Sequence, residues 1–317
     1  METLVERVRI GTRASALARW QTDEVVRQWH AAHPGLVVEV LDVGSAGDDN
    51  PDAPLERMEG IGFFTSTLER ALLESRIDVA VHSYKDLPVQ ETAGLAIAAV
   101  PPRGPIEDAL CARGARLEGL RAGARVGTSS LRRIAQLRAL RPDLECVALR
   151  GNVPTRIERV QRGELDAVVL ARAGLERLGL AAHISEVFPV ERFLTAPAQG
   201  ALAIQVRRDD LARLASLARI DHAPTRRAVD AERAVLHALR GGCSVPVGAA
   251  AEAADSRIAL DAGVFAPDGR RAVRVRIESE EPVATGAEAA RRLLAQGAGE
   301  ILVALERAPR VGWEART

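Results

Sequence analysis

The sequence repeats one pattern of short elements, and this repeat limits the possible fold more than any other feature. The segments RVRIGTRAS at 7–15 and ARVGTSS at 124–130 each indicate a short strand, a Gly-Thr turn and a serine near a helix N-cap. An amphipathic helix follows each segment, the first running to about Ala32 and the second covering LRRIAQLRALR. The repeat therefore predicts two lobes of the same topology.

Two further pairs of segments follow in the same order. Residues 33–45 and 141–152 indicate Pro-initiated turns into buried strands, and 76–83 and 164–171 indicate apolar strands opened by Asp. Because strands alternate with helices, each lobe is expected to be a largely parallel α/β sheet, and such sheets bind ligands beyond the carboxyl ends of their strands. Two facing lobes would place those ends on a shared cleft. Chance similarity between generic βα units is the alternative.

The pattern changes after about Asp221. Residues 224–240 predict a helix, which Gly241 and Gly242 break. Three antiparallel strands with a turn at Pro267-Asp-Gly are then expected, followed by a helix and, as a further candidate, a short strand. The fold class is thus α/β, with a small α+β domain at the C-terminus. The expected domains are lobe 1 at 1–100 with 201–219, lobe 2 at 101–200, and the C-terminal domain at 220–317.

Charge and cysteine content exclude several classes of protein. Lys and Arg total 43, as do Asp and Glu, so the formal net charge is zero, which argues against a nucleic-acid or polybasic membrane binder. The three cysteines are too few for a disulfide framework, and no spacing predicts a metal site. No apolar run approaches the ~20 residues of a membrane span, and no secretory signal is evident. We expect a cytoplasmic protein.

Lys85 is the only lysine, and every other basic residue is an arginine. A GC-rich genome, which encodes arginine wherever a positive charge is needed, is one explanation for the scarcity of lysine. The other is that Lys85 remains because its site needs a compact ammonium group. The apolar strand in VAVHSYKDLPV at 79–89 leads directly into Ser83, Lys85 and Asp86, the expected place for a site. A carboxylate near cations stays ionised and could stabilise a cationic intermediate or move a proton. The alternative is a surface turn, with His82 a packed strand-end residue.

A second candidate site lies in GTSSLRR at 127–133. Free N–H groups and hydroxyls at a helix N-terminus favour an anion, and Arg132 and Arg133 can each hold a carboxylate bidentately. The alternative is an ordinary N-cap followed by two solvated arginines.

Basic residues recur at other strand ends. Gly151 permits a close backbone approach, and Arg150 and Arg156 flank it in RGNVPTR. Together with Arg13 and Ser15 of the first lobe, they predict recognition of a small polyanion, unless the arginines merely reflect an Arg-rich composition.

Cys243 lies on a Gly-Gly loop, where a thiol is accessible and nearby arginines favour its thiolate. No histidine is evident as a base for this thiol, so Cys243 could serve either as a covalent tether or as a nucleophile. Cys111 and Cys146 lie in apolar contexts and are expected to be buried.

Taken together, these pieces resemble one family, the porphobilinogen deaminases, also called hydroxymethylbilane synthases. The similarity runs from about Val8 to at least Gly248, and the combination of HSxKDxP with GGCxVP is specific. The motifs that carry it are RIGTRASALARWQ, VAVHSYKDLP, GTSSLRR, RGNVPTR, APAQGALAI at 196–204 and AERAVLHALRGGCSVPVG at 231–248.

The resemblance implies two lobes like type II periplasmic binding proteins and a third α+β domain. It implies a transferase that condenses four porphobilinogen molecules into hydroxymethylbilane with release of ammonia. A dipyrromethane cofactor is implied as a thioether on Cys243. Asp86 matches the catalytic aspartate, which handles pyrrole N–H groups and the cationic azafulvene left when ammonia departs.

The same resemblance assigns the binding residues, since every pyrrole ring carries two carboxylates. The residues expected at the cofactor, besides Cys243, are Ser83, Lys85, Thr128, Ser129, Arg132, Arg133, Arg150 and Gly151. Those expected at the substrate are Arg13, Ser15, Arg156, Arg177 and Gln199.

One stretch departs from the family pattern. Residues 60–67, GIGFFTST, lack the lysines that the family often carries there, so basic contacts from this loop are in doubt. The alternative function is a non-catalytic bilobal receptor or sensor for a small anion. The family also implies a monomer, and the zero net charge leads us to expect neither nucleic acid nor membrane as a partner.

Overall fold

The computed structural model describes residues 7–44, 63–239 and 245–307, except the side chains of 63–66, 306 and 307. The chain divides into two compact units, Met1–Gly104 with Gly200–Arg226 and Pro105–Gln199 with Arg227–Thr317. The second unit holds both the second α/β sheet and the C-terminal antiparallel sheet. The division into three domains stays a prediction.

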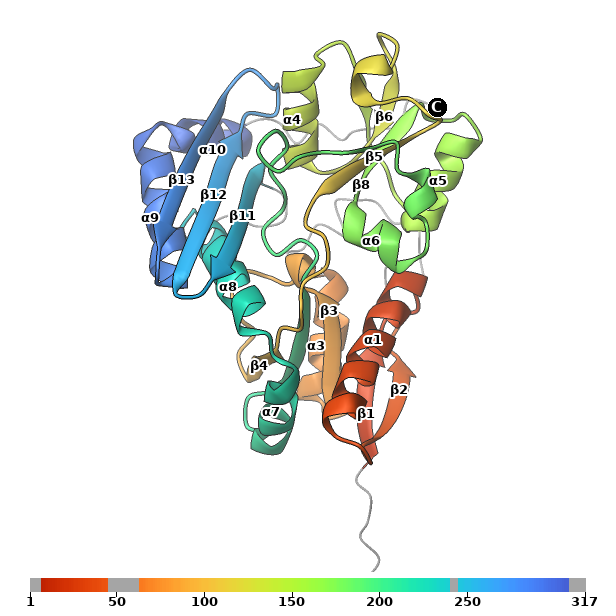
Figure 1. Ribbon diagram of the computed structural model, residues 1–317, viewed down its shortest axis with the longest axis vertical. Helices are drawn as coiled ribbons and strands as arrows, with labels where there is room; N and C mark the ends of the chain where they lie inside the picture. Colours follow the sequence, from red (N-terminus) through yellow and green to blue (C-terminus); the bar gives the residue numbers. More distant parts are fainter. Residues whose placement is uncertain (1–6, 45–62, 240–244, 308–317) are drawn as a thin grey trace, which may run out of the picture. The chain divides into compact units, whose positions relative to one another are not determined.

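The first unit is built on a five-stranded sheet in the order β2-β1-β3-β10-β4 (Figure 1). Strands β2, β1 and β3 are parallel, whereas β10 is antiparallel to both β3 and β4. The strands are β1 (Arg7–Thr12), β2 (Val37–Asp42), β3 (Val79–Ser83), β4 (Leu95–Ala99) and β10 (Leu202–Arg207). The helices are α1 (Ala16–Ala32), α3 (Phe63–Leu73) and α7 (Leu211–Leu217).

The second unit contains a sheet of matching order, β7-β6-β8-β5-β9. Again three strands are parallel, and the fourth strand is antiparallel to its neighbours. The strands are β5 (Asp108–Ala112), β6 (Arg125–Gly127), β7 (Glu145–Val147), β8 (Ala167–Ala171) and β9 (Glu186–Val187). The helices are α4 (Leu131–Leu140), α5 (Val153–Gln161) and α6 (Arg172–Arg177).

Helices cover both faces of each sheet, because alternate strand residues point to opposite sides. In β8, Val169 packs in the cluster that contains α4, whereas Val168 packs in the cluster that contains α5. In the first unit, α1 and α3 likewise pack in separate clusters on the sheet.

The predicted duplication is confirmed by topology and by equivalent contacts. Asp78 accepts the backbone N–H of Arg9 at 2.9 Å, and Asp166 accepts that of Arg125 at 2.8 Å. Each Asp opens the central strand next to the strand that ends in Gly-Thr.

The glycines of the two Gly-Thr pairs are also equivalent. A Cβ on Gly11 would lie 2.4 Å from Ile77, and one on Gly127 would lie 2.8 Å from Leu165. At both positions apolar side chains pack closely over the glycine, so a larger residue would require the Ile77 or the Leu165 side chain to shift.

Two expectations were wrong in detail. Each sheet is mixed rather than largely parallel, because β10 and β5 each run antiparallel to both of their neighbours. Strand β10 reaches the first sheet from beyond the second sheet in the sequence, whereas β5 lies in the same stretch of chain as the rest of its sheet. Near the C-terminus a second helix replaces the candidate short strand. It is α10 (Ala298–Arg307), and its Ala298 and Ile301, three residues apart, join the core as a helical period requires.

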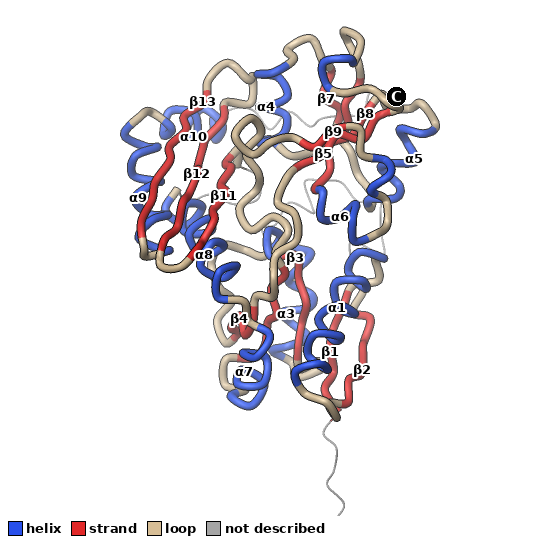
Figure 2. Tube along the Cα trace, viewed as in Figure 1, coloured by secondary structure: helices blue, strands red, loops and turns tan. Residues whose placement is uncertain are grey.

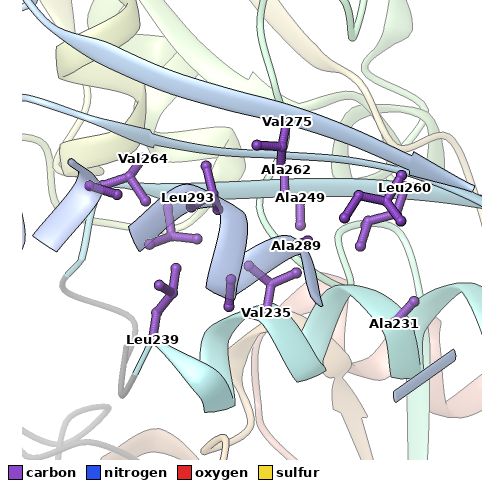
Figure 3. Packing of buried hydrophobic residues seen from close by; sticks show 14 of the residues in the cluster. Ala231, Val235, Leu239, Ala249, Leu260, Ala262, Val264, Val275, Ala289 and Leu293 are labelled. Atoms are coloured by element: carbon purple, nitrogen blue, oxygen red, sulfur yellow. The ribbon is translucent and has the colours of Figure 1, made fainter. Parts of the chain in front are cut away.

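The C-terminal sheet has three antiparallel strands, as expected (Figure 2). They are β11 (Val247–Ala254), β12 (Arg257–Phe265) and β13 (Ala272–Ser279), accompanied by α8 (Ala223–Ala238), α9 (Pro282–Ala295) and α10. Figure 3 shows Val235 of α8 and Leu293 of α9 among the strand residues Leu260 and Ala262. Gly269, with φ of 77°, turns the β12–β13 hairpin at the expected Pro-Asp-Gly.

Candidate functional site

The carboxyl end of β3 carries the predicted Lys-Asp pair on a single 3-10 turn, η1 (Tyr84–Asp86). Buried Tyr84 anchors the turn, and its N–H donates to Ala201 at 3.0 Å. Lys85 is half-buried and Asp86 is exposed. The fold thus holds the backbone of the turn while presenting the Asp86 carboxylate to solvent.

Ser83, directly before this turn, is held by a residue that sequence reasoning missed. Gln21 of α1 is buried, and its Nε2 donates to Ser83 Oγ at 2.8 Å. Helix α1 begins after Ser15, whose side chain accepts the N–H of Ala18 at 3.2 Å. Half-buried Arg13 follows β1, which is parallel to β3, so these residues share one edge of the first sheet.

His82 is buried at the end of the same strand, as predicted. Its Nε2 lies 3.1 Å from Gln205 Oε1, and Gln205 in turn donates to Glu69 at 3.0 Å. Burial lowers the pKa of His82 to about 4; the contact with Gln205 opposes this shift and the charge of Arg13 adds to it. His82 is therefore neutral at pH 7 and serves as a packed strand residue.

In the second unit, Thr128 and Ser129 follow β6 and precede α4. Ser129 Oγ donates to the carbonyl of Leu149 and accepts the Leu149 N–H, both at 2.9 Å. Thr128 is buried, and its Oγ accepts the N–H of Ser130 at 3.3 Å. Ser129 thereby fixes the loop after β7, where Arg150 and Gly151 follow.

Arg132 and Arg133 both pair with a protein carboxylate, Asp108, which sequence reasoning also missed. Arg132 Nη1 lies 2.7 Å from Asp108 Oδ2, and Arg133 Nη2 lies 2.6 Å from Oδ1. Gln199 Nε2 donates to Oδ1 at 2.9 Å as well. All three partners of Asp108 are predicted site residues, and all four residues are buried.

The charge of this cluster is fixed. Burial alone would raise the pKa of Asp108, but Arg132 and Arg133 outweigh burial and hold that pKa well below its ordinary value. The Asp108 carboxylate is therefore ionised at every pH at which the protein works. It neutralises part of the charge of two guanidiniums and fixes their orientation.

The Arg150–Arg156 segment forms the turn into α5. Gly151 has φ of 97°, in the left-handed region that favours glycine, and its carbonyl accepts Arg156 Nε at 2.7 Å. Asn152 caps α5 by accepting the N–H of Thr155 at 3.0 Å. Arg177 lies at the end of α6, which follows β8.

The predicted residues thus form two groups, one on each unit. The first unit carries Arg13, Ser15, Ser83, Lys85 and Asp86. The second carries Thr128, Ser129, Arg132, Arg133, Arg150, Gly151, Arg156, Arg177 and Gln199.

Two features singled out in the sequence lie outside the described residues. Cys243 falls within 240–244, and most of the 60–67 loop falls within 45–62 and the undescribed side chains after it. The other two cysteines are buried, as predicted, and burial raises the pKa of the Cys111 thiol to about 12. Within the described part of the chain, no cluster of His, Cys, Asp or Glu could hold a metal ion, and no helix is long and apolar enough to cross a membrane.

Comparison with known proteins identifies related chains. The family model described as "Porphobilinogen deaminase, dipyromethane cofactor binding domain" matches residues 8–215, and "Porphobilinogen deaminase, C-terminal domain" matches 227–295. The porphobilinogen deaminase of Desulforudis audaxviator is 47% identical over 92% of this chain and 96% of its own. That of Brevibacillus brevis is 44% identical over 93% and 96%. Among solved structures, a periplasmic binding protein of Salmonella typhimurium is 14% identical, with a TM-score of 0.39 over 68% of this chain and 91% of its own.

Proposed function

This chain belongs to the porphobilinogen deaminase family, and on that premise we propose that Asp86, at the carboxyl end of β3, is its catalytic group and that the neighbouring Lys85 binds a carboxylate of the cofactor. The chain is a transferase of tetrapyrrole biosynthesis that condenses porphobilinogen into hydroxymethylbilane and releases ammonia. It uses a dipyrromethane cofactor. A non-catalytic anion receptor is not favoured.

The observation that carries the proposal is the 3-10 turn η1. It keeps Asp86 exposed beside a half-buried Lys85 while buried Tyr84 holds the backbone. A carboxylate fixed in this way can stabilise the positive charge that develops on the substrate when ammonia departs. Lys85 offers a compact cation for a carboxylate of the cofactor. Arg13, Ser15 and Ser83 lie at the same edge of the sheet and supply further donors.

The second unit fits a polycarboxylate cofactor by the chemistry of its donors. Guanidinium and hydroxyl groups bind carboxylates. The second unit places such groups after strands β6 and β7 and at the start of α4: the guanidiniums of Arg132, Arg133 and Arg150 and the hydroxyls of Thr128 and Ser129. We propose that these residues, with Gly151, hold the dipyrromethane, which Cys243 binds as a thioether. When bound, it supplies the pyrrole at which chain growth starts. Arg156, Arg177 and Gln199 are proposed to contribute to substrate binding.

We also propose that the protein is a cytoplasmic monomer, with neither nucleic acid nor membrane as a partner. The monomer follows from the family resemblance. Zero formal net charge argues against a nucleic-acid or membrane partner, and the buried free thiols of Cys111 and Cys146 agree with a reducing compartment. Sedimentation of the purified protein at several concentrations tests the monomer, and a mass that rises with concentration would contradict it.

Intact mass and turnover of the same sample test the proposed function. The purified chain should carry the extra mass of one dipyrromethane, react with Ehrlich's reagent, and release ammonia from porphobilinogen. Cys243→Ser should lose all three properties, whereas Cys111→Ser and Cys146→Ser should keep them. A Cys243→Ser protein that still carries covalent pyrrole would refute the tether, and wild-type protein with neither adduct nor turnover would favour the receptor.

A further inference from the structure

Glu232 is a fully buried carboxylate on α8 that joins three segments of the second unit. Its Oε2 accepts the N–H of Ala198 at 2.6 Å, and its Oε1 accepts the N–H of Ala251 in β11 at 2.8 Å. A buried carboxylate is costly unless its oxygens accept hydrogen bonds, so this arrangement specifies where the two N–H groups must lie. Glu232 therefore fixes the segment before β10 against both α8 and β11.

The segment held by Glu232 has an unusual backbone. Ala198 has φ of 61°, a left-handed conformation that costs a non-glycine residue free energy and persists only where its surroundings enforce it. The hydrogen bond from the Ala198 N–H to Glu232 helps to hold Ala198 in this conformation. A second contact, from Ala249 N–H to the carbonyl of Thr195 at 3.0 Å, ties the same segment to β11.

The strained residue directly precedes Gln199. Gln199 Nε2 donates to the carbonyl of Ile106 at 2.7 Å and to Asp108 Oδ1 at 2.9 Å. Asp108 in turn orients Arg132 and Arg133. A continuous series of short contacts therefore leads from Glu232 through the Ala198 turn to the arginine pair.

We propose that Glu232 is a positioning residue for the carboxylate-binding arginines, acting through Gln199 and Asp108. The inference rests on the proposed function, because it explains how a residue on α8 holds the arginine pair that we propose binds the cofactor. In this role Glu232 acts through its contacts with the backbone and not on the ligand itself. Its loss should shift the Gln199 amide and loosen the orientation of Asp108 and both guanidiniums, while the three-stranded sheet and its core stay folded.

Glu232→Gln tests this role with little change of shape. The amide has one acceptor oxygen, so its NH₂ group must face one of the two backbone N–H groups. The matched control is Glu186→Gln: Glu186 is also buried in the second unit and accepts a backbone N–H, that of Leu117, at 2.7 Å. Melting temperature, the fraction of chains carrying the adduct by intact mass, and KM and kcat are measured on both variants.

We expect both variants to melt lower, but only Glu232→Gln to lose adduct and to raise KM for porphobilinogen, by about tenfold. Adding Glu232→Gln to Gln199→Ala should cause little further loss of adduct, because both changes act on one series of contacts. If Glu232→Gln does not fold, Glu232→Asp, which keeps the charge on a shorter side chain, takes its place.

Two results would overturn the inference while leaving the proposed function intact. The first is that the Glu232 variant and Glu186→Gln carry the same fraction of adduct and have the same KM for porphobilinogen. The second is that the losses of adduct caused by Glu232→Gln and Gln199→Ala add fully in the double variant. Wild-type protein without adduct or turnover would instead overturn the proposed function, and this inference with it.

Discussion

Arg133 Nη2 of α4 lies 2.6 Å from Oδ1 of Asp108, the first residue of β5, and both side chains are buried. Arg132 holds the other oxygen of the same carboxylate at 2.7 Å. Two positive charges thus share one negative charge, so the cluster keeps a net positive charge next to the N-terminus of α4. Positive charge at a helix N-terminus favours an anion there, which supports the proposal that a ligand carboxylate binds at this point.

Asp108→Asn should destabilise the fold strongly. It leaves two buried guanidiniums without their counter-charge, and removing one partner of a buried ion pair typically costs about 3–5 kcal/mol. Urea unfolding measures the loss in free energy, and intact mass measures the loss of adduct. Glu288→Gln, which breaks exposed pairs with Arg291 and Arg292, is the control and should leave the unfolding midpoint unchanged. Equal effects of the two changes would contradict the role of Asp108.

The repeated strands were predictable because their signals are local. Gly11 and Gly127 lie at or next to the last residue of their strands, closely packed by apolar side chains, and Asp78 and Asp166 open the next strand to pair, so the same short pattern recurs twice. The antiparallel strand β10 was not predictable, because it pairs with β3 from more than one hundred residues away.

The site was predictable only where residues sit on a motif. Lys85 and Asp86 follow an apolar strand, which marks a strand end in any α/β sheet. Asp108 and Gln21 do not belong to a motif that indicates a site. Asp108 lies 24 residues from Arg132, and Gln21 lies 62 residues from Ser83, so each pairing exists only after the sheets have formed.

Asp86→Asn should abolish most turnover without affecting the fold. The change removes the negative charge while keeping the size of an exposed side chain. Transition-state electrostatic contributions of this kind are commonly worth about 2.7–4 kcal/mol, which corresponds to a fall in kcat of about 10²–10³. Product formation and melting temperature are measured together, with Glu91→Gln, another exposed carboxylate of the first unit, as the control. Near-normal turnover would rule out Asp86 as the catalytic group.

Lys85→Arg tests whether the only lysine reflects chemistry or composition. The change keeps the charge but replaces a compact ammonium by a wide planar fork. Because Lys85 is half-buried on the turn that carries Asp86, the larger group should displace a bound carboxylate or Asp86 itself. We expect a folded protein with strongly reduced turnover or poor cofactor assembly, measured beside melting temperature. Unchanged activity would mean that Lys85 is an accident of an arginine-rich composition.

His82 should make the protein less stable as pH falls from 6.5 to about 4. Above pH 6.5 the imidazole is neutral in both the folded and the unfolded chain, so it contributes no pH dependence. Below pH 6.5 the unfolded chain binds a proton that the folded chain, with the pKa of His82 at about 4, does not, and stability declines. The full loss is about 3 kcal/mol. Burial and the charge of Arg13 lower this pKa, while Gln205, which also contacts Glu69, faces the ring from β10.

Urea unfolding of wild type and His82→Gln at several pH values between 7.5 and 4 checks this prediction. The glutamine cannot titrate, so the variant should lose less free energy of unfolding over this range, even if it is less stable at pH 7.5. Asp108 does not obscure the comparison. The pKa of Asp108 lies below its ordinary 3.8 in the folded chain, so its contribution is lost only as pH falls from near that value. Parallel pH profiles for the two proteins would show that His82 stays accessible to protons in the fold.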